Sequence, residues 1–218
     1  ISPGSRITEN SLAGDYLASL GVSPDAFSSY LQRRVNHEVM MRGTFNNPHI
    51  QNEITPDKRG GWTVHQPSGE VMTIFDAHKR YRADDRALVV VAGRDYGTGS
   101  SRDWAAKGAH LLGVRAILAE SFERIHRCNL VGMGVLPLQF ANGETRLSLG
   151  LDGTETVDIL GLDGSICPQD KVAVRFNHAQ RGPFDISVVC RLDTAREVAW
   201  YEAGGIMPYV LDRFSNAA

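Results

Sequence analysis

The residues of this chain best suited to chemistry form one short stretch after the apolar run Val89–Ala92. The stretch holds three glycines, two adjacent serines and an arginine: Gly93, Gly97, Gly99, Ser100, Ser101 and Arg102. A glycine loop that opens a helix presents unpaired backbone N–H groups and the positive end of the helix dipole. With the Arg102 guanidinium beside them, these groups predict a receptor for a carboxylate or phosphate, with two hydroxyls at its centre.

The residues around the serines disfavour nucleotide binding. A P-loop requires a lysine directly before its serine or threonine, and Gly99 stands there. A dinucleotide fingerprint would use Glu120 as its ribose-binding acid, but its third glycine is replaced by Arg102, which cannot fit where helix and strand touch. A structural alternative stays open, in which Ser100 only caps a helix. Against it, a cation in the first turn is unfavourable unless an anion lies nearby.

The elements that must position this stretch alternate between strand and helix patterns. The predicted elements, beginning and ending with a strand, are 88–92, 100–112, 116–119, 121–130 and 135–140. Ser100 and Ser121 are the expected N-caps of the two helices, and Gly113 ends the first helix. We expect a right-handed, parallel βαβαβ unit.

The flanking regions predict further helices and strands in an α/β fold. On the N-terminal side, helices and a β-hairpin are expected at 12–20, 25–41, 62–65, 71–75 and 76–81. After residue 141, β-rich segments and two closing helices are expected at 156–160, 171–176, 184–190, 195–203 and from 208 onward. Residues 1–30, rich in Ser, Pro and Gly, are predicted to be a connecting arm, and residues 31–218 the domain itself.

The composition is that of a globular protein and disfavours nucleic acid and membranes as partners. The net charge of −2 over 218 residues gives no electrostatic case for binding nucleic acid or an anionic membrane. No apolar run reaches the roughly 20 residues that span a bilayer. Three scattered cysteines favour a reducing compartment, and we expect the cytoplasm, or the mitochondrial matrix in a eukaryote. Because the first residue is Ile1 and not methionine, we expect a piece of a longer polypeptide.

Four segments resemble signatures of the C-terminal domain of the aconitase family. The longest is Gly99–Gly108, which reads Gly-Ser-Ser-Arg-Asp-Trp-Ala-Ala-Lys-Gly, and Ala119–Arg127 matches as well. Asn36–Phe45 resembles the first signature of that domain, and Gly204–Ile206 resembles its closing segment. The resemblance covers essentially the whole chain. It implies a swivelling β/β/α domain with a parallel βαβαβ core, additional β-strands and a C-terminal helix.

The resemblance also implies a reaction, the isomerisation of citrate and isocitrate through cis-aconitate. In the family, the serine that matches Ser100 is the base that removes the carbon-bound proton, while Ser101, Arg102 and Arg42 match substrate-binding positions. Removing a proton beside a carboxylate builds up negative charge, which N–H donors and cations stabilise. The same groups favour the charged form of a serine hydroxyl. Taken alone, Arg42 would be interpreted as an arginine that bonds the last carbonyls of its helix.

The family's [4Fe-4S] cluster is expected to lie outside this chain. Its iron acts as a Lewis acid, and the three cysteines that hold it have no counterpart in Cys128, Cys167 or Cys190. We therefore expect no metal ligand here. The expected partners are a tricarboxylate substrate and the N-terminal cluster-bearing domains of the same polypeptide. The chain is predicted to be part of a hydro-lyase of the tricarboxylic acid cycle, and to be inactive alone.

Departures from the family pattern lie on either side of Arg42. Leu31 and Val35 replace the usual glycines, and further changes follow at residues 46–49. Because these changes can alter the pocket wall, a relative that acts on 2-methylisocitrate or another tri- or dicarboxylate stays open. So does the small subunit of an isopropylmalate or homoaconitate isomerase. RNA binding, known for one family member, is disfavoured by the net acidity.

The remaining reactive side chains are predicted to be structural. We expect His37 and His126 on helix faces, outside the chemistry, and Cys128 in an apolar core. Lys107 and Glu123 are predicted to be solvated or structural.

Overall fold

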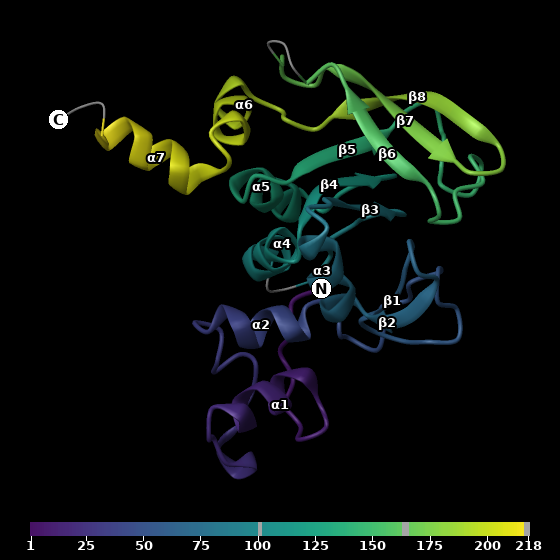
Figure 1. Cartoon of the computed structure of the whole chain (residues 1–218). Coiled ribbons are helices and arrows are strands. Elements are labelled where there is room, and N and C mark those ends of the chain that lie inside the picture. The colour runs from purple at the N-terminus through teal and green to yellow at the C-terminus, as the bar shows by residue number, and fades with distance from the viewer. Residues whose placement is uncertain (100–101, 163–165, 216–218) are drawn as a thin grey trace. The chain divides into compact units, whose positions relative to one another are not determined.

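The chain consists of two compact units. A computed structural model describes residues 1–99, 102–162 and 166–215 (Figure 1). The N-terminal unit comprises Ile1–Arg86 and Leu111–Gly113, and the C-terminal unit comprises Ala87–His110 and Val114–Ala218.

The N-terminal unit combines short helices with a β-hairpin. Its elements are α1 (Leu12–Ser19), the 3-10 helix η1 (Pro24–Ala26), α2 (His37–Gly43), the antiparallel strands β1 (Trp62–His65) and β2 (Glu70–Thr73), and α3 (Ile74–Ala83). Each α-helix begins after a polar residue whose side chain accepts a backbone N–H from the first turn, namely Ser11, Asn36 and Thr73. The core of this unit includes the fully buried Leu17 and Met40.

The predicted helix over residues 25–41 is wrong. Only the 3-10 helix η1 forms at its start, and α2 does not begin until His37. Ser28 has a φ of +66°, in the left-handed region, so a right-handed helix cannot pass through it. The side chain of Asn36 then accepts two N–H groups of the first turn of α2, which starts a new helix.

The C-terminal unit is built on one mixed sheet with the strand order β3-β4-β5-β8-β7-β6. The strands are β3 (Leu88–Ala92), β4 (Val114–Ala119), β5 (Leu136–Phe140), β6 (Thr156–Leu160), β7 (Lys171–His178) and β8 (Gly182–Cys190). Strands β3, β4 and β5 run parallel, which confirms the predicted core. Strand β8 joins β5 in the antiparallel sense, and β7 and β6 extend the antiparallel half.

Helices α4 (Arg102–Leu111) and α5 (Arg124–Gly132) connect the parallel strands and lie on one side of them (Figure 1). The prediction that Ser121 caps α5 is wrong. The carboxylate of Glu123 accepts the N–H of His126 at 2.8 Å, and α5 therefore begins at Arg124. Ser121 instead bonds the loop that follows β3, as described below. Glu123 thus has the structural role that was one of its two predicted alternatives.

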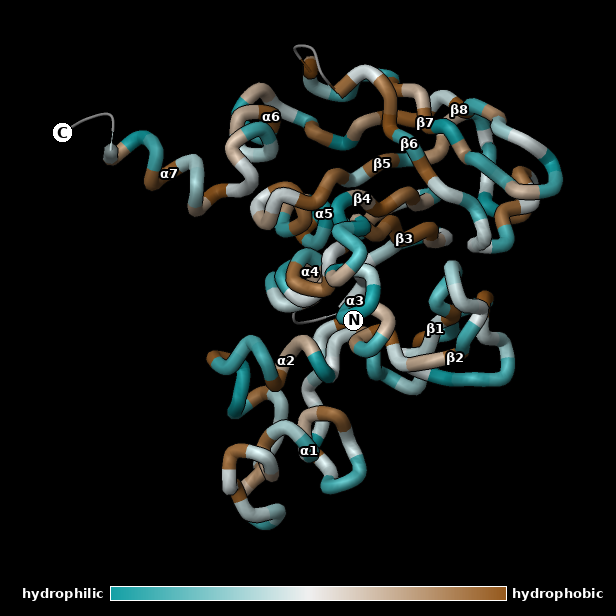
Figure 2. Tube along the Cα trace, viewed as in Figure 1, coloured by the Kyte–Doolittle hydropathy of each residue, from teal (hydrophilic) through white to brown (hydrophobic). Residues whose placement is uncertain are grey.

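The core of the C-terminal unit lies on the strands, which are the most hydrophobic part of this unit in Figure 2. Leu118, Leu138, Val174 and Val188 are buried there. After β8 come α6 (Ala195–Glu202) and α7 (Ile206–Ser215), the latter beginning two residues before the predicted start.

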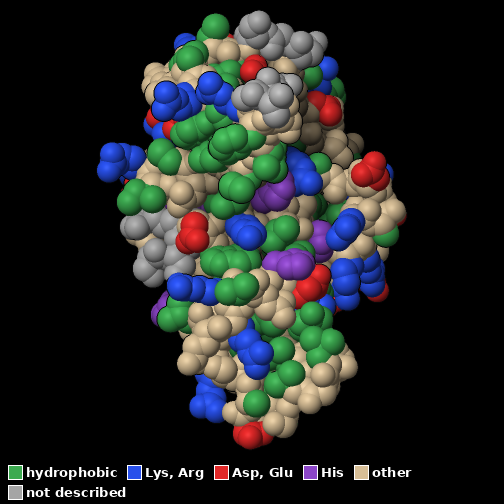
Figure 3. Space-filling view, turned by 90° about the vertical axis from the view of Figure 1, so that its left-hand side faces the viewer, with side chains coloured by type: hydrophobic (Ala, Val, Ile, Leu, Met, Phe, Trp, Pro, Cys, Tyr) green, Lys and Arg blue, Asp and Glu red, His purple; other side chains and the backbone are tan. Residues whose placement is uncertain are grey.

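Helix α7 exposes apolar side chains. The side of the structure that carries α7 faces the viewer in Figure 3, where hydrophobic side chains gather. Those of α7 that are exposed are Met207, Leu211 and Phe214. Within the described part of the chain, no helix is both long and apolar enough to cross a membrane.

Candidate functional site

The glycine loop at residues 93–99 follows β3 and is bonded to the segment that follows the neighbouring strand β4. The N–H of Asp95 donates to the hydroxyl of Ser121 at 2.7 Å, and the N–H of Tyr96 donates to the Ser121 carbonyl at 3.0 Å. The N–H of Glu123 donates to the Tyr96 carbonyl at 2.9 Å. The two segments therefore continue the parallel pairing of their strands beyond the sheet, and this pairing fixes the backbone of the loop.

Gly97 sits directly against the ring of His126. It has a φ of +91°, and a Cβ built on it would lie 2.0 Å from Cδ2 of His126. The ring of Tyr96 lies 5.3 Å from the His126 ring and packs edge-on against Phe122. His126 is on the fully buried face of α5, so its ring forms part of the support beneath the loop. His37, by contrast, lies at the start of α2 with an exposed ring, 3.5 Å from a carboxylate oxygen of Glu38.

The two charged residues of the loop, Arg94 and Asp95, are bonded to the end of β4 and the segment that follows it. Arg94 Nε donates to Glu120 Oε2 at 3.2 Å. The Glu120 carboxylate therefore joins the end of β4 to the loop. Lys107 lies on α4 with its ammonium 4.8 Å from the Trp104 ring, a structural contact of the kind predicted for it.

Ser100 and Ser101, the predicted base and one of its neighbours, lie outside the described residues. Arg102 is the first residue of α4, and only its backbone is described. The described loop ends at Gly99, so the two serines connect it to the N-terminus of α4. This order of loop and helix N-terminus is the one that the sequence predicts for an anion receptor.

Arg42 lies in the last turn of α2, within the N-terminal unit. Its Nη1 donates to the Glu38 carboxylate at 2.6 Å and to the Glu38 carbonyl at 2.8 Å. The hydrogen bond from Arg42 holds the pKa of Glu38 below its ordinary value despite partial burial. The guanidinium also lies over the rings of Tyr16 and Phe75. These two aromatic residues were not predicted from the sequence, because they belong to two other helices and no local motif links them to Arg42.

Cys128 is not in an apolar core, contrary to the prediction. Its sulfur lies 3.1 Å from Arg127 Nη2 and 3.8 Å from Glu197 Oε1, and the residue is only partly buried. Arg127 is itself buried and binds both oxygens of Glu197. Glu197 belongs to α6, 70 positions beyond Arg127, so the sequence around Cys128 did not show that this carboxylate lies beside the thiol.

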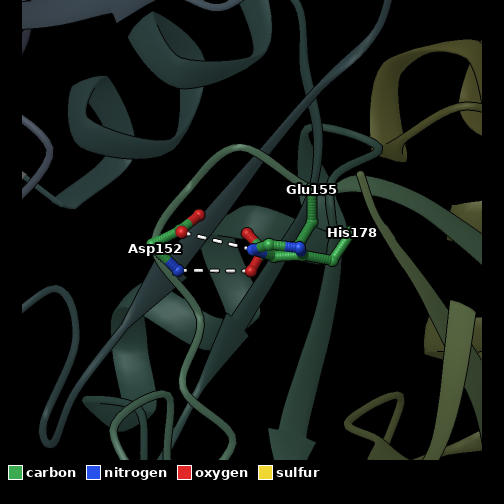
Figure 4. A group of neighbouring side chains, drawn as sticks. All are labelled: Asp152, Glu155 and His178. Atoms are coloured by element: carbon green, nitrogen blue, oxygen red, sulfur yellow. Dashed lines mark hydrogen bonds and ion pairs between the residues drawn. The ribbon is translucent and has the colours of Figure 1, made fainter. Parts of the chain in front are cut away.

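Asp152, Glu155 and His178 form a compact group at the loop before β6 (Figure 4). His178 Nδ1 accepts the N–H of Gln180 at 3.1 Å, so Nε2 carries the ring proton and faces Asp152 Oδ2 at 3.3 Å. Both oxygens of Glu155 accept backbone N–H groups of the loop, those of Asp152 and Gly153. These bonds use the atoms that would ligate a metal ion, and they tie the loop to the β7–β8 hairpin.

These observations define an α/β domain that carries a glycine-rich loop and a helix N-terminus at the carboxyl end of a parallel strand. The chain belongs to the aconitase C-terminal domain family, whose model matches residues 13–143.

Three bacterial proteins named aconitate hydratase A illustrate the similarity. The protein of Pseudomonas aeruginosa is 55% identical over 97% of this chain, that of Legionella pneumophila 52% over 99%, and that of Escherichia coli 50% over 97%. This chain spans only 23–24% of the length of these relatives. Among solved structures, the 3-isopropylmalate dehydratase of Methanocaldococcus jannaschii matches with a TM-score of 0.38 and 20% identity, over 59% of this chain and 66% of that one.

Proposed function

We propose that this chain is the C-terminal domain of an aconitate hydratase, a hydro-lyase that interconverts citrate and isocitrate through cis-aconitate. The observation that carries the proposal is the 55% identity to aconitate hydratase A of Pseudomonas aeruginosa over 97% of this chain. The domain supplies the base and the arginines, and the remaining domains of the polypeptide complete the site.

In the proposed reaction, the hydroxyl oxygen of Ser100 removes a proton from the carbon beside a substrate carboxylate. The electron pair left on that carbon forms the double bond of cis-aconitate as the hydroxyl group of the neighbouring carbon leaves with its bonding electrons. The leaving group takes up a proton and departs as water, and Ser100 returns to its charged form when it releases the proton that it removed. Arg42, Ser101 and Arg102 bind substrate carboxylates. Positive groups placed in advance at these carboxylates stabilise the charge that develops in the transition state. The N-terminus of α4 favours the charged form of the Ser100 hydroxyl in the same way.

The cysteines of this chain do not fit an iron–sulfur cluster. Such a cluster requires several thiolates close together. Cys128 is partly buried in α5, Cys167 is exposed and Cys190 is buried in β8. Among the described residues, the one close group of potential metal ligands contains no cysteine. We therefore propose that the [4Fe-4S] cluster is held by the N-terminal domains of the same polypeptide.

The Ser100→Ala variant of the full-length, cluster-loaded enzyme tests the proposal. Loss of a general base lowers turnover by about 10²–10⁴-fold, so kcat for citrate should fall by that factor while KM changes little. Steady-state kinetics with citrate and with isocitrate measure both constants. Arg102→Ala should raise KM as well, because the substrate loses a cation.

Ser187→Ala provides the control, because Ser187 is an exposed serine on β8 far along the chain from the loop. It should leave kcat and KM unchanged. A Ser100→Ala enzyme with the kcat of the wild type would show that Ser100 is not the base.

A further inference from the structure

The Arg42 guanidinium lies over the faces of two aromatic rings within the N-terminal unit. Its central carbon, Cζ, is 4.1 Å from the centroid of the Tyr16 ring and 4.4 Å from that of the Phe75 ring. The Arg42 side chain keeps only 16% of its exposure. The three residues come from α1, α2 and α3, so tertiary packing and not local sequence brings them together.

One edge of the guanidinium is occupied, and another is available. Both hydrogen bonds of Arg42 use Nη1, and both go to Glu38. Within the described part of the chain, Nη2 and Nε have no hydrogen-bond partner. These two nitrogens form a planar pair of donors, and a carboxylate matches such a pair with two parallel hydrogen bonds.

The rings and Glu38 together restrict how the guanidinium can move. A free arginine side chain has many rotamers, and binding a ligand must immobilise them at a cost in free energy. Cation–π contacts with two rings and an ion pair at one edge already immobilise the Arg42 side chain in the absence of a ligand, so binding loses less conformational entropy. The rings also remove water from the guanidinium, which strengthens its attraction for an anion.

We propose that Tyr16 and Phe75 are positioning residues, which hold the Arg42 guanidinium in the orientation that binds a carboxylate of the substrate. The identity of that substrate rests on the proposed function. The role of the two rings rests on their geometry around Arg42. Tyr16 lies in residues 1–30, which the sequence predicts to be a connecting arm, so this segment contributes to the substrate site.

Replacement of Tyr16 in the full-length, cluster-loaded enzyme tests the proposal. In Tyr16→Leu the guanidinium loses one ring face, and KM for citrate should rise about tenfold while kcat stays within about twofold. Tyr16→Phe keeps the ring and should keep the wild-type KM. Phe75 is buried and its replacement can disturb folding, so Tyr16, which is only partly buried, carries the test.

A double-variant series separates positioning from a general structural effect. In an Arg42→Lys background, Tyr16→Leu should raise KM by less than about twofold, because the group that the ring positions is already gone. Trp62→Leu is the matched control. It removes an aromatic face from another cation of the same unit, Lys58 at 4.8 Å, and should leave KM unchanged.

An unchanged KM in Tyr16→Leu, or an equal rise in KM with and without Arg42, would overturn the positioning role. A wild-type enzyme that does not turn over citrate would instead overturn the proposed function. The position of the guanidinium is then tested without substrate, in a crystal structure of the full-length Tyr16→Leu protein. In that structure the Arg42 guanidinium should have moved away from the Phe75 ring. A guanidinium that still occupies the wild-type position would contradict the proposal.

Discussion

The space that a side chain at position 97 would need is filled by the ring of His126. Gly97 meets two separate requirements, because its φ of +91° favours glycine and because any Cβ would collide with that ring. The sequence predicted the glycine loop but not the second requirement. His126 is 29 positions away from Gly97 on a different element, and only the fold brings the two together.

Gly97→Ala should destabilise the chain by more than a positive φ alone explains. The left-handed conformation costs alanine about 1–2 kcal/mol. The clash with the ring adds about 1–3 kcal/mol, as for other overpacked sites. Urea unfolding measures the sum.

Gly143→Ala is the matched control, since Gly143 has a φ of +75° and nothing lies within 4 Å of the place that its Cβ would take. Gly143→Ala should lower the free energy of unfolding only by the cost of the left-handed conformation, about 1–2 kcal/mol. Equal losses in the two variants would show that the His126 ring yields to a methyl group.

At the scale of the elements, Arg127 joins α5 to the segment that leads into α6. It donates to both oxygens of Glu197 and to the carbonyl of Arg191, and it pairs with Asp193 at 3.3 Å. Burial raises the pKa of Glu197, but its hydrogen bonds with Arg127 and the Asp193 N–H outweigh this, so the pKa lies below its ordinary value. The pKa of Asp193 is lowered in the same way, against burial, by Arg191 and Arg127.

Arg127→Met should cost about 3–5 kcal/mol, because it leaves the buried carboxylate of Glu197 without its cation. The exposed pair of Arg175 and Asp185 is the control, and Arg175→Met should change the free energy of unfolding far less. Urea unfolding at pH 7 compares the variants. A similar small decrease in the free energy of unfolding in both variants would show that the buried ion pairs of Arg127 do not stabilise the chain.

Acid should weaken the same ion pairs. In the folded chain the pKa values of Glu197 and Asp193 lie below their ordinary values of 4.5 and 3.8. The two ionised carboxylates therefore contribute fully to the free energy of unfolding above their ordinary pKa values. This contribution is lost as the pH falls toward the lowered pKa values of the folded chain. Unfolding midpoints of the wild type should therefore fall below about pH 4.5, and those of Arg127→Met should fall less steeply. Parallel declines would contradict this.

The strands of the parallel core were predictable, and some helix starts were not. Apolar runs with a glycine close to one end predicted β3, β4 and β5, because such a pattern can be recognised in each segment alone. The helix predicted over residues 25–41 failed at Ser28, where the backbone is left-handed and the carbonyl accepts the N–H of Ile7 from another segment. The predicted cap Ser121 failed because its hydroxyl is engaged by Asp95, on another loop.

At the scale of the whole molecule, the candidate site residues belong to both units. Arg42 is in the N-terminal unit, and the glycine loop is in the C-terminal unit. The motifs around both could be predicted from the sequence, because each is a continuous run of residues. The rings of Tyr16 and Phe75, which lie over the Arg42 guanidinium, could not be predicted, because α1 and α3 contact Arg42 only in the folded unit.

The isolated 218-residue chain should not hydrate cis-aconitate, because it spans about a quarter of the length of its relatives and its cysteines do not form a cluster site. The loss of cis-aconitate absorbance measures the rate, with the full-length enzyme as positive control. Appreciable turnover by the purified, iron-free chain would refute the expected division of the active site.

The contact of Gly97 with His126 also restricts how this loop can evolve. A lineage can replace both residues only one at a time. A larger residue at position 97 beside the His126 ring produces a clash. Loss of the ring while Gly97 remains leaves a void beneath the loop, so this order is also destabilising. Natural variation at the two positions should therefore be coupled, and the pair should persist together even where other residues of the loop diverge.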